Sequence, residues 1–141
     1  MTAALLISLA FAARPALAES SFRLVKAQLT GAAEVPGPGD PDGSGSARIR
    51  LFPNENMVCF TIRVKNIILP TIGAHIHAGT ADVAGPVVVP LTPPDKSGTS
   101  SGCVEADEAL IREIFKNPAN YYVNVHTTDF PGGAVRGQLT K

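Results

Sequence analysis

The stretch from Met57 to Val64, MVCFTIRV, decides the fold because it alternates strictly. Every second residue from Val58 to Val64 is large and apolar, and the residues between them are smaller or polar. Successive side chains of a strand point to opposite faces of a sheet, so this pattern predicts a half-buried β-strand. Just before it, Ala47 to Leu51 alternates apolar residues with arginines, and Pro53 to Asn56 supplies the turn between the two strands.

The rest of the chain repeats short strand signals between turns, with 13 Gly and 12 Pro overall. Only residues 106–116 have helical spacing, because Leu110, Ile111, Ile114 and Phe115 fall on one side of a helix. We therefore predict one all-β domain, a β-sandwich or barrel with one short helix. Further strands are expected at residues 22–29, 74–78, 87–91, 121–127 and 134–139, and loops at residues 36–46 and 93–102.

The N-terminus has the pattern of a signal peptide. Met1 to Ala13 is apolar and uncharged, and Ala16-Leu17-Ala18 matches the small-x-small pattern of a cleavage site. The apolar run is shorter than the roughly 20 residues that span a bilayer. We expect a signal peptide at residues 1–18, a mature domain at 19–141, a periplasmic or secreted location and no membrane insertion after cleavage; a buried N-terminal helix is the alternative.

The two cysteines are expected to form a disulfide. Cys59 and Cys103 are the only pair, and an exported protein meets an oxidising compartment. Their spacing does not match the CxxC pattern of a metal-binding thiolate pair.

The charge balance excludes two classes of partner. With 12 Lys and Arg against 12 Asp and Glu, the formal net charge is zero. Such a composition does not predict a nucleic-acid partner, nor a polybasic patch that would hold an anionic membrane.

The three histidines are the candidate metal ligands. His75 and His77 are two residues apart in an expected strand and therefore point the same way, and His126 lies in a later strand. Three neutral imidazoles with no thiolate suit copper, or less well zinc. The alternative is that all three are structural, hydrogen-bonded residues.

Arg136 is expected near this site. If the last hairpin is symmetric about Pro131, Arg136 lies opposite His126 on the same face. Its guanidinium would disfavour protonation of His126 and attract small anions to an open metal position.

Several motifs together resemble the CHRD domain, which is named for its repeats in chordin and also occurs in single-domain exported bacterial proteins. The resemblance covers nearly all of the expected mature chain and implies an all-β, immunoglobulin-like or Greek-key fold. The motifs are LTGAAEVP at 29–36, GAHIHAG at 73–79, GPVVV at 85–89, NPANYYVNVHT at 117–127 and PGGAVRGQL at 131–139.

A looser similarity links the histidines to Cu/Zn superoxide dismutases, which also place an HxH pair on one strand, a single histidine on a later strand and an arginine after it. That similarity implies copper ligation by His75, His77 and His126, and an anion-guiding Arg136. The chain has no other histidine to supply further copper or zinc ligands. We therefore expect copper handling (storage, delivery or tolerance) ahead of a superoxide dismutase-like enzyme or a metal-free extracellular interaction module.

Overall fold

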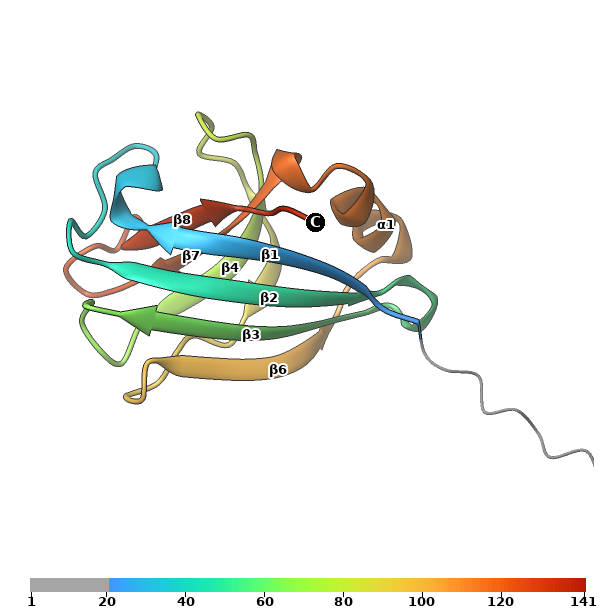
Figure 1. Ribbon diagram of the computed structural model, residues 1–141, viewed down its shortest axis with the longest axis horizontal. Coiled ribbons are helices and arrows are strands. Elements are labelled where there is room, and N and C mark those ends of the chain that lie inside the picture. The colour runs from blue at the N-terminus through green and yellow to red at the C-terminus, as the bar shows by residue number, and fades with distance from the viewer. Residues whose placement is uncertain (1–20) are drawn as a thin grey trace, which may run out of the picture.

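Eight strands form one hydrogen-bonded sheet in the computed structural model of the protein, which describes residues 21–141 (Figure 1). The expected signal peptide lies outside the described residues. The strand order is β5-β4-β7-β8-β1-β2-β3-β6. The strands are β1 (Arg23–Thr30), β2 (Ser44–Phe52), β3 (Met57–Lys65), β4 (Gly73–Ala78), β5 (Val87–Leu91), β6 (Thr99–Glu105), β7 (Tyr121–His126) and β8 (Val135–Gln138); short 3-10 turns are η1 (Gly31–Ala33), η2 (Pro53–Glu55) and η3 (Pro118–Asn120), and the one described α-helix is α1 (Glu108–Lys116).

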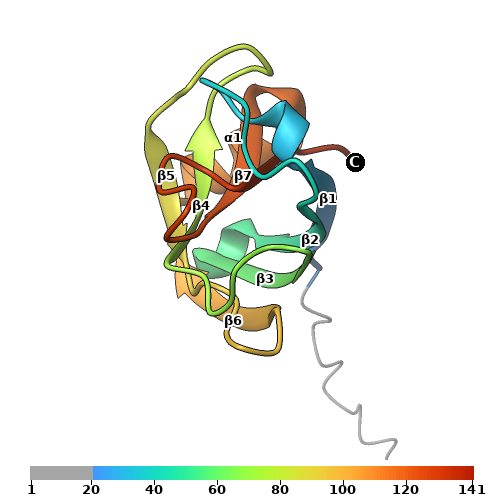
Figure 2. The same ribbon diagram turned by 90° about the vertical axis from the view of Figure 1, so that its left-hand side faces the viewer.

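The sheet curls until it is nearly closed. Figure 2 shows β1, β2 and β3 on one side and β4, β5 and β7 on the other, with the two edge strands β5 and β6 on the open side. The prediction of an all-β fold with one short helix is confirmed. Its two packed layers are parts of one continuous sheet, so every strand between the edges is paired on both sides.

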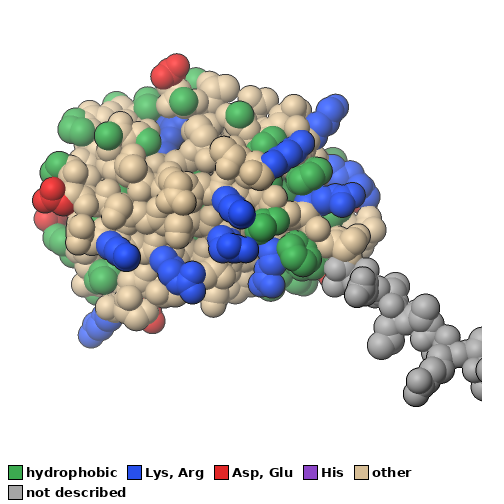
Figure 3. Space-filling view, viewed as in Figure 1, with side chains coloured by type: hydrophobic (Ala, Val, Ile, Leu, Met, Phe, Trp, Pro, Cys, Tyr) green, Lys and Arg blue, Asp and Glu red, His purple; other side chains and the backbone are tan. Residues whose placement is uncertain are grey.

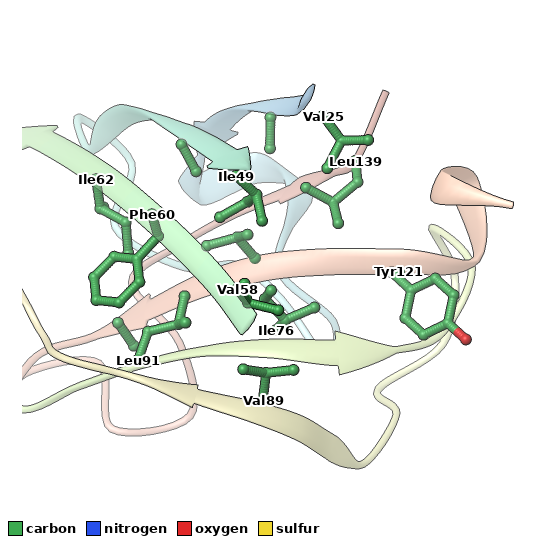
Figure 4. Close-up of a cluster of buried hydrophobic side chains, with 14 of the residues drawn as sticks. Val25, Ile49, Val58, Phe60, Ile62, Ile76, Val89, Leu91, Tyr121 and Leu139 are labelled. Atoms are coloured by element: carbon green, nitrogen blue, oxygen red, sulfur yellow. The ribbon is translucent and has the colours of Figure 1, made fainter. Parts of the chain in front are cut away.

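The core lies inside the curl and follows the predicted alternation. Val58, Phe60 and Ile62 of β3 are almost completely buried. They meet Ile76 and Val89 from the opposite layer, as Figure 4 shows. Each such side chain removed from water contributes about 1.5–3 kcal/mol before entropic costs, which explains why the alternating residues fix the inner face.

Strand β6 was not predicted, because its first part falls in the expected loop at residues 93–102. It is an edge strand that pairs only with β3, and its polar residues Thr99 to Ser101 give no alternation of apolar and polar side chains. Its register places Cys103 opposite Cys59, and the two form the predicted disulfide.

Helix α1 closes one end of the core. It begins two residues later than predicted, because Asp107 is its N-cap and accepts hydrogen bonds from the backbone N–H groups of Ala109 and Leu110. Ile111 and Ile114 are fully buried, and Leu110 and Phe115 pack beside them at the margin. No helix within residues 21–141 has the length and apolar character needed to cross a membrane.

Charged side chains are segregated, although their sum is zero. The outward side of β1, β2 and β3 carries Lys and Arg side chains and no Asp or Glu, as Figure 3 shows. The expectation that the chain lacks a polybasic patch is therefore wrong. Composition gives only the sum of the charges, whereas strand alternation places these cations together on one face.

Candidate metal centre

The fold brings the three histidines together across two neighbouring strands. β4 and β7 are antiparallel, with Gly73 opposite His126 and His75 opposite Asn124. Ala74 and Ile76 of β4 and Val125 of β7 point into the core. The histidines, which alternate with these residues, therefore share the outer face of the sheet.

The spacing of the ring nitrogens suits a single ion. One nitrogen from each of His75, His77 and His126 lies within 4.8 Å of the other two. The shortest separation joins His75 Nδ1 and His126 Nε2, at 3.2 Å. Two ligands about 2.0 Å from a tetrahedral ion are about 3.3 Å apart, so this pair already has the required separation.

His77 presents a nitrogen with nothing to bind. Its Nδ1–H donates to the carbonyl oxygen of Gly85 at 2.8 Å, which leaves a lone pair on Nε2. The imidazole stacks on the Tyr122 ring, with centroids 4.8 Å apart and planes 9° from parallel. His77 is 9% exposed, and its Nε2 is buried without a hydrogen-bond partner. Leaving a buried polar atom unsatisfied costs about 1–3 kcal/mol, and a bound metal ion would relieve that cost.

His126 is oriented in the same way by its backbone contact. Its Nδ1–H donates to the carbonyl oxygen of Pro131 at 2.9 Å, so the lone pair of Nε2 faces His75. A backbone carbonyl that fixes the tautomer and angle of an imidazole is the usual support of a metal-ligating histidine.

Asn124 is a site residue that the sequence analysis missed. It is 3% exposed, and its Oδ1 lies 3.0 Å from His126 Nε2. The side-chain amide faces that lone pair either with its NH2 group as a donor or with its oxygen beside a bound ion. Its position two residues before His126 on one strand was the signal that placed it on the same face.

Burial favours the neutral form of His75 and His126. It lowers the pKa of His75 below the ordinary value of 6.5, and the neighbouring His126 and His77 lower it further, against a hydrogen bond from Asn124 that raises it. Burial also lowers the pKa of His126, as does His77, while the Pro131 carbonyl raises it. Neutral imidazoles are the form that binds metal, so the site is prepared for an ion at neutral pH.

Arg136 does not have the predicted register. It pairs with Asn124, and His126 lies two residues closer to the turn of the hairpin, because Val125 pairs with Val135. The guanidinium carbon lies 3.4 Å from the centroid of the Tyr122 ring. Two groups cannot stack on the same side of one ring, so Tyr122 separates Arg136 from His77. The guanidinium is 1% exposed and donates to the carbonyl oxygen of Thr80 and to Gln138 Oε1.

Glu34 forms a buried polar cluster with Asn124 and Arg136, and the sequence analysis also missed it. It is 5% exposed, and burial raises its pKa from 4.5 to about 7, against the lowering effects of Arg136, Asn124 and the Val35 backbone N–H. A side chain at Gly133, where φ is +142°, would collide with the Glu34 carboxyl group. The glycine therefore makes room for the acid, which the LTGAAEVP motif contains.

Comparison with protein-family models gives a match to the one described as the CHRD domain, over residues 25–139. No curated protein and no solved structure matches the chain.

Proposed function

The chain belongs to the CHRD domain family, and we propose that it is an exported protein that binds one copper ion through His75, His77 and His126. Its role would be copper handling, meaning storage, delivery or tolerance. The observation that carries the proposal is the buried Nε2 of His77, which has no hydrogen-bond partner. The ring is fixed by the hydrogen bond from its Nδ1–H to Gly85 and by stacking on Tyr122. A merely structural histidine has no reason to keep a buried ring nitrogen without a hydrogen-bond partner.

The donor set favours copper over zinc. It consists of three imidazole nitrogens and contains no thiolate and no carboxylate. Cu²⁺ binds such ligands more tightly than Zn²⁺ in the general order of divalent affinities. Three protein ligands also leave a position open, and the Asn124 amide lies beside the ligand His126.

We assign Arg136 a supporting role. Its guanidinium packs on one side of the Tyr122 ring and His77 stacks on the other side. The arginine therefore positions the ligand His77 through the tyrosine ring. An arginine that guides anions needs a path to the open position, and here the ring stands in between. This arrangement favours copper handling over superoxide chemistry.

The disulfide supports the proposed location. Bridges such as Cys59–Cys103 persist in oxidising compartments, which agrees with a signal peptide at residues 1–18 and a secreted or periplasmic domain at 19–141.

A metal titration of the mature chain, Glu19 to Lys141, tests the proposal. Copper in both oxidation states and zinc compete with a chelator of known affinity, and each histidine is replaced by alanine singly and then together. We expect one-to-one copper binding, tighter than zinc, with each single variant losing more than the 10–100-fold typical of an outer-shell residue.

The outcomes separate the alternatives. Tighter zinc binding would leave the site in place and overturn the choice of metal. Equal binding by the parent and the triple variant would return the histidines to structural roles and leave the metal-free interaction module as the function.

A further inference from the structure

The outer face of β1, β2 and β3 concentrates positive charge far beyond what the composition suggests. All five of its charged side chains are basic and exposed, and no acidic residue lies on these strands. Among residues 21–141 the only ion pair joins Arg112 to Glu108 on α1, so none of the five is neutralised by a close carboxylate. We call this surface the basic face; its cations are Lys26, Arg48, Arg50, Arg63 and Lys65.

The strand register arranges these cations in a strip. Lys26 lies directly opposite Arg48, while Arg50 is one pleat toward one end and Arg63 one pleat toward the other. With Lys65 the strip spans six residues of strand, or about 20 Å. Like charges directly opposite each other destabilise a sheet unless an anion lies over them.

An apolar end adjoins the strip. Phe22 is 47% exposed, and its ring centroid lies 5.6 Å from that of Phe52. Phe22 and Leu24 line a hollow of about 350 Å³ together with Arg48 and Arg50. Figure 3 shows hydrophobic side chains, in green, beside Lys and Arg side chains, in blue, at one end of this face.

We propose that the basic face docks on an anionic phospholipid surface, with the cations over the head groups and Phe22 entering the interface. Charge complementarity accounts for the cations, and the exposed aromatic ring beside them favours a membrane over a soluble polyanion, which has no apolar layer to receive it. The inference is independent of the metal centre, since none of these residues belongs to it.

Vesicle binding tests the inference with the intact mature chain. Sedimentation with phosphatidylcholine vesicles that contain phosphatidylglycerol is compared with pure phosphatidylcholine at about 0.1 M salt, where the Debye length is about 10 Å. Each cation near such a surface is worth about fivefold in partitioning, so Arg48→Gln/Arg50→Gln should bind about 25-fold more weakly. The matched control, Lys96→Gln/Lys116→Gln, changes net charge equally but lies off the face and should bind nearly as the parent does.

A third variant distinguishes the partner. Phe22→Ser should weaken vesicle binding and leave retention on a heparin column unchanged, because only a membrane receives the ring. Equal losses in the face and control variants, equal binding to neutral vesicles, or tight binding to heparin or single-stranded DNA without vesicle binding would each overturn the proposal. Circular dichroism and thermal melts of every variant verify that it is folded.

Discussion

Removing the bridge between Cys59 and Cys103 should destabilise the fold by about 4 kcal/mol. The cysteines are 44 residues apart in sequence. On the chain-entropy model a loop of that length restricts the unfolded chain by about 13 cal/mol/K, or about 4 kcal/mol at 25 °C. With an unfolding entropy of about 2.1 cal/mol/K per residue for a domain of this size, the Tm should fall by about 16 °C.

Urea denaturation and thermal melts of the oxidised protein, the reduced protein and Cys59→Ala/Cys103→Ala measure this effect. The reduced protein keeps both side chains, so it separates loss of the bridge from loss of packing by the sulfur atoms. Copper affinity should not change, since neither cysteine supplies a ligand. A reduced protein within about 1 kcal/mol of the oxidised one would refute the entropic reasoning, because the chain-entropy model gives about 4 kcal/mol for this loop.

Three further predictions concern the polar cluster. Copper affinity should collapse below about pH 6, because the ligands must be neutral and burial lowers the pKa of His75 and His126 below 6.5; a chelator competition that is flat from about pH 5 to 8 would exclude the histidines as ligands. Asn124→Leu should weaken copper binding about 10–100-fold and Asn124→Asp should restore it, measured in the same competition; equal affinity in both would remove Asn124 from the site. The folded state keeps a proton on Glu34 up to about pH 7, against 4.5 in the unfolded chain. Stability should therefore fall as pH rises between those values, and Glu34→Gln should flatten the fall in urea titrations across this range.

The inner face of the sheet and the grouping of the histidines could be predicted from the sequence, because both depend on the two-residue period of a strand. Val58 to Val64 and the pair His75 and His77 each needed only that period to be placed. The features that could not be predicted depend on pairing between segments that are far apart in the sequence. The register that sets Asn124 opposite Arg136, and thereby places the guanidinium behind Tyr122, is fixed by the length of the last hairpin.

Burial by loops was equally out of reach of the sequence analysis. Glu34 lies just after β1 in a Gly- and Pro-rich segment, and nothing in its neighbours indicates that it will be enclosed. The basic face is a third case, since five cations spread over forty positions gather only once β1, β2 and β3 are side by side. Edge strand β6 is a fourth feature that could not be predicted, because pairing with β3, and not a pattern of apolar residues, makes it a strand.

The unclosed side of the sheet has a consequence for how copies of the chain behave at high concentration. Strands β5 and β6 each leave one row of backbone groups without a partner strand, and such rows template fibrous aggregation. Pro90 removes one donor from β5, and the ladder between β4 and β5 shifts its register after Ile76, so this edge is neither flat nor continuous. On the other edge, Glu105 at the end of β6 brings a charge that an incoming identical strand would have to face. These features disfavour edge-to-edge pairing between copies of the chain, although the sheet does not close.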